Sequence, residues 1–468
     1  MKKIAFLLAF LAGCAVGPDY VRPQIEAPAQ FKEMQGWRQA EPRDALPRGS
    51  WWAMFGDREL DALMARVDLS NQTLRAAEAR FRQSRALADQ ARAALFPALS
   101  ANASATRSKS PSLSNQPSFA VGAVNNYSVS LNTSWELDVW GRVRRSVEAG
   151  EAGWQASAAD LEAARLSAYA ALAQNYFALR VADATRQLLE DTVAAYERTF
   201  ELTRNRYAAG VAARVDVVQA EVQWKSAQAQ LIDVGVERAQ LEHAIALLVG
   251  EAPAAFSIER APFAASMPAI PVGLPSELLE RRPDIATAER NAAAANARIG
   301  VAQAAFFPTV TLSGAAGFRS TSAADLLTTP SRFWSLGGAL AQALFDAGLR
   351  EAQKAQAIAV YDEDAATYRQ TVLTAFQEVE DNLAALRILE EEARLQDEVV
   401  QAARHALELT TNQYQAGIVS YLNVISAQTT LLTNERTAAS LLGRRLTASV
   451  ALVKASGGGW SAESLPRR

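Results

Sequence analysis

Four segments of the chain alternate between apolar and polar side chains, which predicts β-strands with two different faces. The clearest pattern lies in 127–139, where odd positions such as Trp135 are apolar and even positions such as Asn132 are polar. The expected strands span about 98–107, 126–139, 309–319 and 333–345. Each is close to the length of about 9–11 residues that crosses a bilayer when the strand is tilted.

Outside the strands, apolar residues recur at helical spacings with charged residues between them, as in coiled-coil contacts. The stretches 141–207 and 349–414 contain no proline and are rich in Ala, Leu, Glu, Arg and Gln, which are strong helix formers. Shorter helical stretches at 213–249 and 419–455 follow after a turn that contains glycine. We therefore expect two long antiparallel helix hairpins, with tips near residues 210 and 417.

The two halves of the chain repeat the same motifs in the same order, which indicates an internal duplication. Residues 91–97 (Ala-Arg-Ala-Ala-Leu-Phe-Pro) match 302–308 (Ala-Gln-Ala-Ala-Phe-Phe-Pro), and 205–210 (Asn-Arg-Tyr-Ala-Ala-Gly) match 412–417 (Asn-Gln-Tyr-Gln-Ala-Gly). Each copy should contain helices, a strand pair and a helix hairpin. The expected divisions are an N-terminal signal at 1–13, a segment at 14–56 before the repeats, a first repeat at 57–252, a linker at 253–282, a second repeat at 283–455 and a tail at 456–468.

Composition and charge exclude several functional classes. The 468 residues are 50% hydrophobic and carry a formal net charge of −3, which argues against a nucleic-acid partner because such proteins usually present a basic face. The only two histidines, His243 and His405, lie in helical stretches without the spacing of a metal site. With no catalytic constellation either, we expect neither an enzyme nor a bound metal or cofactor.

The single cysteine, Cys14, follows the features of a secretory signal. Lys2 and Lys3 form a basic start, an apolar run follows, and Leu11-Ala12-Gly13-Cys14 ends it. This ending resembles the lipobox of bacterial lipoproteins, in which the cysteine carries a covalent lipid and becomes the first residue. The alternative is an ordinary signal with a chance cysteine. Ala15 follows, and resemblance to the sorting signals of bacterial lipoproteins, in which an aspartate at this position implies retention in the inner membrane, implies the outer membrane here.

Any passage through a membrane would have to use the strands, because no stretch approaches the roughly 20 apolar residues of a spanning helix. Four strands cannot close on themselves, and an open edge in lipid leaves backbone groups unsatisfied. Two copies of the chain would supply eight strands and three copies twelve. The polar face of the second strand, with Asn132, Glu136 and Asp138, would then line water.

Several segments together resemble one family, the TolC/OprM-type outer-membrane efflux proteins, and most closely the lipoprotein branch that serves resistance-nodulation-division pumps. They are Cys14–Tyr20, Trp51–Asp57, Trp135–Arg142 and Leu279–Ile285. The resemblance covers nearly the whole chain. It implies an α+β membrane protein in the outer membrane, with a twelve-stranded barrel built by a homotrimer and a periplasmic α-barrel built from the helix hairpins. It also implies a periplasmic adaptor protein and an inner-membrane resistance-nodulation-division pump as partners.

The same resemblance assigns roles to the hairpin tips. The residues expected to dock the adaptor are Tyr207, Gly210, Arg214, Asp216, Tyr414, Gly417 and Ser420, and the candidates for the periplasmic constriction are Tyr421, Leu422, Asn423 and Ser426. Better-known members carry acidic residues near that constriction, where this chain has Asn423 and Ser426. A hydrogen-bonded or apolar constriction is therefore expected. Ordinary contacts within a helix hairpin are the alternative for each tip residue.

Two other functions stay open at this stage. One is the export duct of a type I protein-secretion system, which would share the channel architecture. The other is a lipid-anchored periplasmic coiled-coil scaffold without a pore, which would require the alternating segments to be soluble hairpins.

Overall fold

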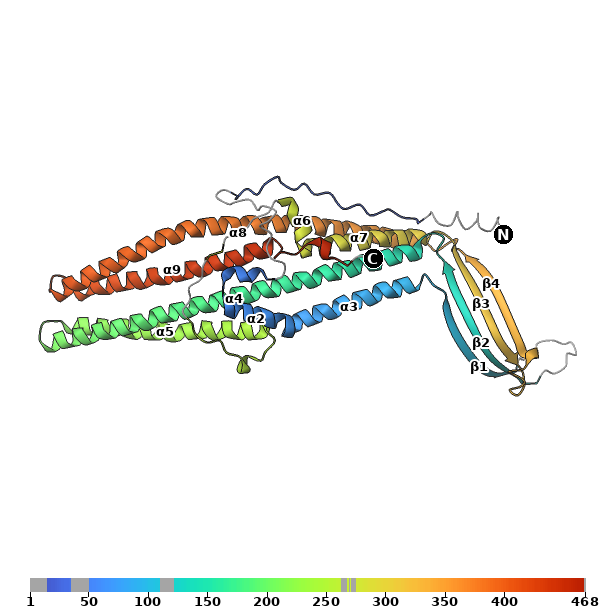
Figure 1. The fold of residues 1–468 in the computed structure, drawn as a ribbon, viewed down its shortest axis with the longest axis horizontal. Coiled ribbons are helices and arrows are strands. Elements are labelled where there is room, and N and C mark those ends of the chain that lie inside the picture. The colour runs from blue at the N-terminus through green and yellow to red at the C-terminus, as the bar shows by residue number, and fades with distance from the viewer. Residues whose placement is uncertain are drawn as a thin grey trace.

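The computed structural model describes residues 15–34, 50–109, 122–261, 267–268, 270 and 275–466. Within these residues the chain forms a long body of helices and, at one end of it, a curved four-stranded sheet (Figure 1). The expected signal peptide and the lipidation candidate Cys14 lie outside the described residues.

The duplicated order of elements is confirmed. The main elements, in chain order, are η1 (Trp51–Phe55), α2 (Arg58–Ser70), α3 (Gln72–Ala93), β1 (Ala98–Ser108), β2 (Val124–Leu137), α4 (Arg142–Ala208), α5 (Arg214–Leu248), α6 (Leu278–Arg281), α7 (Pro283–Ala304), β3 (Thr309–Ser320), β4 (Arg332–Ala341), α8 (Leu349–Gln415) and α9 (Tyr421–Ala455). In each half, a helix leads into a strand pair, and the strand pair leads into a helix hairpin.

The four strands form one antiparallel sheet in the order β1-β2-β3-β4. The sequence predicts one strand pair in each repeat, and the structure adds that β2 and β3 join the two pairs, with Trp135 opposite Leu312. The observed strands differ most from the prediction in β2 and β4. β2 runs from Val124 to Leu137 rather than over 126–139, and β4 stops at Ala341 because its partner β3 begins at Thr309, directly opposite.

The long helices α4 and α8 each contain 67 residues, and the return helices α5 and α9 each contain 35. At 1.5 Å per residue the long helices span about 100 Å. Gly210 and Gly417 follow α4 and α8 with φ angles of 76° and 77°, the left-handed conformation that glycine adopts without strain. No helix in the described ranges is both long and apolar enough to cross a membrane.

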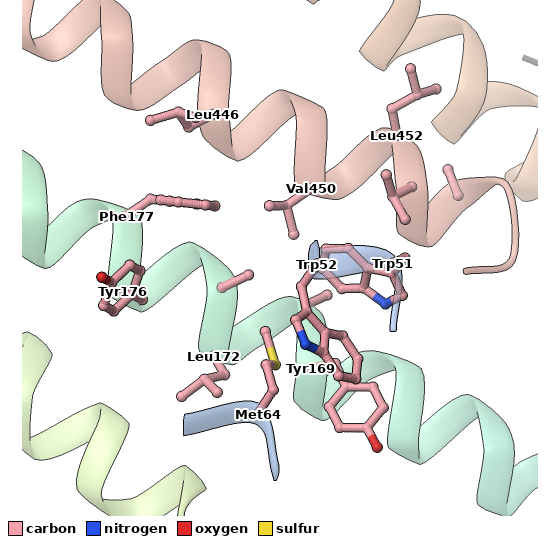
Figure 2. Packing of buried hydrophobic residues seen from close by; sticks show 14 of the residues in the cluster. Trp51, Trp52, Met64, Tyr169, Leu172, Tyr176, Phe177, Leu446, Val450 and Leu452 are labelled. Atoms are coloured by element: carbon pink, nitrogen blue, oxygen red, sulfur yellow. The ribbon is translucent and has the colours of Figure 1, made fainter. Parts of the chain in front are cut away.

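The main hydrophobic core lies midway along the helical body, where α4 of the first repeat meets α9 of the second (Figure 2). Trp51 and Trp52 of η1 insert there, and the Trp52 ring lies 4.6 Å from that of Tyr169 on α4. Val450 of α9 faces them. η1, which precedes the first repeat, thus fills the contact between α4 of the first repeat and α9 of the second.

The N-terminal segment 15–34 runs along α7 and α8 (Figure 1). Val16 N donates to the Trp140 carbonyl at 3.0 Å, next to the junction of β2 and α4. Arg145 of α4 donates to Asp19 at 2.8 Å, and the Tyr20 hydroxyl donates to the Glu289 carboxylate of α7 at 2.8 Å. This segment therefore ties both repeats together close to the sheet.

Candidate functional site at the hairpin tips and the sheet faces

The two helix hairpins end side by side at the end of the body that is farthest from the sheet (Figure 1). Arg206, near the end of α4, joins them. Its Nη1 donates to the Gln415 carbonyl at 3.2 Å, and its guanidinium lies 5.0 Å from the centre of the Tyr414 ring. A cation over an aromatic face is attracted by the ring quadrupole. Arg206 thus joins the two tips, and the Gln223 side chain of α5 adds a 3.0 Å hydrogen bond to the Thr429 hydroxyl of α9 further along the hairpins.

A small apolar cluster lies beneath this contact. Its buried members are Ala220, Tyr414, Tyr421 and Val424. The rings of Tyr414 and Tyr421 are 5.3 Å apart. Burial raises the pKa of the Tyr421 hydroxyl far above its ordinary value, and the neighbouring Tyr414 adds to the shift. The cluster therefore holds Tyr421 in its neutral form.

The cluster corrects two of the assignments made from the sequence. Tyr421 is only 1% exposed and Tyr414 only 5%, so neither side chain lines a passage nor presents a docking surface in this conformation. The physical reason is the helical period: Tyr421, Val424 and Gln428 occupy the face of α9 that is turned into the protein. The other constriction candidates, Leu422, Asn423 and Ser426, are exposed together on the opposite side of this turn.

The remaining docking candidates lie at the surface. Tyr207, Gly210, Arg214, Gly417 and Ser420 are exposed. Asp216 is half-buried, and its Oδ2 accepts a hydrogen bond of 3.3 Å from the Ala213 backbone N–H. An acidic side chain in the first turn of a helix also interacts favourably with the helix dipole. Asp216 thus stabilises the start of α5, and its role in docking stays a prediction.

Sequence reasoning missed Arg206, whose side chain links the first tip to the second. The available signal was the one charge difference within the repeated tip motif, where Arg206 stands opposite Gln413. The contact itself could not be read from the sequence, because its acceptor is a backbone carbonyl in the other repeat.

The second part of the site is the pair of faces of the sheet. Asn132 is paired with Ser100 on β1 and with Ala315 on β3, which makes a row of polar and small residues across the sheet. The neighbouring row carries Leu131 and is apolar. Register therefore keeps the two faces distinct across all four strands, as the alternation predicted.

Of the three candidates for the water-lining face, two lie on the sheet. Asn132 and Glu136 share the polar face of β2, and Glu136 accepts two hydrogen bonds, of 2.8 and 2.6 Å, from Arg142. Asp138 does not belong to the strand. Its carboxylate accepts 2.8 Å hydrogen bonds from the backbone N–H groups of Val143 and Arg144, so it caps the start of α4.

The apolar face of the sheet is open to solvent in the single chain. Trp334 is 75% exposed and Leu336 is 81% exposed. A face of this kind is expected to lie against a partner or a membrane rather than water.

Comparisons with known proteins agree with this geometry. The family model described as "Outer membrane efflux protein" matches residues 63–251 and 274–458. The pyoverdine export outer membrane protein OpmQ of Pseudomonas aeruginosa is 33% identical, covering 99% of this chain and 98% of its own length. The probable efflux pump outer membrane protein TtgC of Pseudomonas putida is also 33% identical, over 98% and 96%.

The solved structure of the outer-membrane channel OprN superimposes with a TM-score of 0.89 and 31% identity, covering 96% of this chain and 100% of that one. The matched regions include both hairpins and the sheet. The chain therefore belongs to the outer membrane efflux protein family, and it is an outer-membrane efflux channel protein with a large periplasmic helical part.

Proposed function

We propose that three copies of the chain form the outer-membrane duct of a tripartite efflux system. The observation that carries this proposal is the pair of open edges, β1 and β4, on a sheet with one apolar face. Such edges expose backbone donors and acceptors, each of which costs several kcal/mol in lipid. Pairing β4 of one copy with β1 of the next removes every edge.

Three copies would give a twelve-stranded barrel. Two would give eight strands, which is about the size at which side chains fill the interior. The resemblance to TolC/OprM-type channels also favours three. The polar face, with Asn132 and Glu136, would enclose the water-filled passage, and the face with Trp334 and Leu336 would meet lipid.

The helix hairpins would continue the passage into the periplasm. Six hairpins, two from each copy, would form the wall of an α-barrel, and the exposed tip residues would dock a periplasmic adaptor protein. Leu422, Asn423 and Ser426 would form the constriction, with Arg206 holding neighbouring hairpins together beside it. Since the constriction carries no acidic residue, polar contacts and apolar contacts would close it.

The cargo would be small toxic compounds, handed over by an inner-membrane resistance-nodulation-division pump. OpmQ is named for pyoverdine export and TtgC for an efflux pump, which supports a small-molecule cargo.

A covalent lipid on Cys14 would anchor the assembly in the outer membrane. Ala15, the next residue, lies beside Gly141 at the junction of strands and helices, and this is the level at which an anchor would enter the inner leaflet.

Purified protein in detergent and in planar bilayers tests this function. We expect a stable oligomer of three times the 50.4 kDa chain mass, and discrete conducting steps. Deletion of the gene should reduce drug tolerance in a strain that depends on this channel. A monomer that conducts no current would sink the proposal in favour of a scaffold without a pore.

The anchor has its own test. Cys14→Ser should retain the oligomer and its conductance but lose incorporation of a labelled fatty acid. Equal labelling of the wild type and the variant would refute the lipid on Cys14.

A further inference from the structure

The ends of the strands that lie farthest from the helices carry an excess of positive charge. Arg107, Lys109, Arg319 and Arg332 lie there with one carboxylate, Asp325, and none of the four cations is within ion-pair distance of a carboxylate in the described part of the chain. The other ends of the strands differ. There Glu136 pairs with Arg142 at 2.6 Å, and Asp346 pairs with Arg350 at 2.5 Å.

Register divides the cations between the two faces of the sheet. Arg107 alternates with the alanines of the apolar face of β1, and Arg332 is paired with Phe318 on that same face. The Arg332 guanidinium lies 5.9 Å from the centre of the Phe318 ring. Arg319 is on the polar face, with its guanidinium 5.0 Å from the centre of the Phe333 ring.

The apolar face is ordered along the strands. On β1, Arg107 is outermost and alanines continue from it to Leu99 at the helix-proximal end; on β4, Arg332 is outermost and Trp334 follows it. From Arg107 to Leu99 the strand is about 26 Å long, or roughly 20 Å along the membrane normal at a tilt of about 40°. Apolar bands of barrels are about 25 Å tall with aromatic girdles, so the Cα atoms of Arg107 and Arg332 lie near the outer edge of the band, from which their long side chains reach the outer headgroups.

Closure of the barrel brings these two cations together. β1 runs away from the helices and β4 runs toward them, so the pairing of β4 with the next copy's β1 is antiparallel. When the helix-proximal ends of these strands, Ala98 and Ala341, are paired, Arg332 of one copy lies opposite the next copy's Arg107. Two guanidinium groups at one junction repel each other unless an anion lies between them.

We propose that each subunit junction binds a phosphorylated glycolipid headgroup of the outer leaflet through Arg107 and Arg332. Guanidinium groups bind phosphate oxygens in a bidentate manner, and the aromatic and aliphatic residues below them offer a surface for the acyl chains. The occupant is a lipid rather than a free phosphate, because the cations are continuous with the exposed apolar face. The inference rests on the trimeric barrel proposed above.

The test uses the full-length oligomer, freed of lipid in detergent and titrated with bisphosphorylated lipid A while native mass spectrometry counts the lipids bound. We expect about three lipids per trimer. The double variant Arg107→Gln/Arg332→Gln should bind at least about tenfold more weakly, since each arginine near a lipid headgroup contributes about 1 kcal/mol. Arg319→Gln is the matched control, because it removes the same charge at the same level from the other face, and its affinity should stay within about twofold.

Lipid A that lacks its phosphates should bind the wild type as weakly as the double variant binds the intact lipid. Equal loss in Arg319→Gln, equal binding of the dephosphorylated lipid, or displacement of the lipid by millimolar inorganic phosphate would each overturn the proposal. The mass of the lipid-free oligomer distinguishes failure of the lipid inference from failure of the proposed trimeric barrel. A wild type that stays monomeric refutes the barrel and its junctions together, whereas a conducting trimer without these lipid sites refutes the lipid inference alone.

Discussion

The two hairpin tips derive from one repeated motif, yet they occupy different environments. Tyr207 at the first tip is 45% exposed, whereas its counterpart Tyr414 at the second is 5% exposed and packs against Tyr421. The position equivalent to Tyr421 in the first repeat is Arg214, which is exposed. The same motif therefore makes a buried aromatic pair in one copy and a surface in the other.

The arrangement of the hairpins explains the difference. α4 and α9 lie against each other in the middle of the body, so the second tip faces a neighbour within its own chain. The corresponding side of the first tip has no neighbour in the described part of the chain. In the proposed trimer, the next copy's second hairpin would lie there. Within one chain, the contact surface beside the second tip is therefore occupied, whereas the equivalent surface beside the first tip is left for the next copy.

The largest expected effect tests the filled contact. Tyr421→Ala removes a buried ring and should lower the local stability of the second tip by about 3 kcal/mol. Hydrogen exchange of residues 407–425 should measure the lost protection. Arg214→Ala, at the equivalent exposed position, is the matched control and should change protection by less than about 0.5 kcal/mol. Similar losses in both variants would show that the tips are equivalent after all.

The next test concerns the link between the tips. Arg206→Gln gives the first tip the residue that the second has at Gln413, and it removes both the bond to Gln415 and the contact with Tyr414. A loss of about 1–2 kcal/mol is expected. If the link keeps the tips closed, the conducting fraction in planar bilayers should rise about tenfold. Gln413→Ala should leave the conducting fraction unchanged. A rise in this control would show that the two tips contribute equally to closure.

A smaller effect should follow from exchanging the residues that begin the return helices. Asp216→Asn loses charge near the N-terminus of α5 and weakens the bond to Ala213, at about 0.5–1 kcal/mol. The reciprocal Asn423→Asp should stabilise the start of α9 by a similar amount. Exchange of amides in the first turn of each helix measures both changes. Opposite signs from those stated would show that the dipole is not the dominant factor.

The smallest effect appears only in alkaline solution. Because burial raises the pKa of Tyr421, the folded tip keeps a proton that the unfolded chain loses near pH 10. The stability of the second tip should therefore be constant below about pH 10 and fall as the pH rises further. Burial also raises the pKa of Tyr20, Tyr169, Tyr176 and Tyr196, so the ultraviolet tyrosinate band should show several late-titrating groups. Tyr421→Phe should lower the late-titrating amplitude by one tyrosine, and Leu422→Ala should leave it unchanged. An unchanged late amplitude in Tyr421→Phe would contradict the prediction.

Much of the fold could be predicted from the spacing of apolar residues and from the positions of turn-forming glycines. The strands and hairpins were found because a period of two and a helical period are properties of the backbone, and Gly210 and Gly417 mark turns that need a left-handed residue. The periodicity alone does not mark where a strand ends. Asp138 continues the alternation of β2, but its carboxylate is taken by the N–H groups at the start of α4.

Residue order alone specifies the duplication, the two faces of each strand and the family resemblance. The pairing of β2 with β3, the burial of Tyr421 and the reach of Arg206 to the second hairpin follow only from the folded chain. Each of these contacts joins the two repeats. A repeated motif carries the same local preference in both copies, and its environment depends on which neighbour the fold places against it.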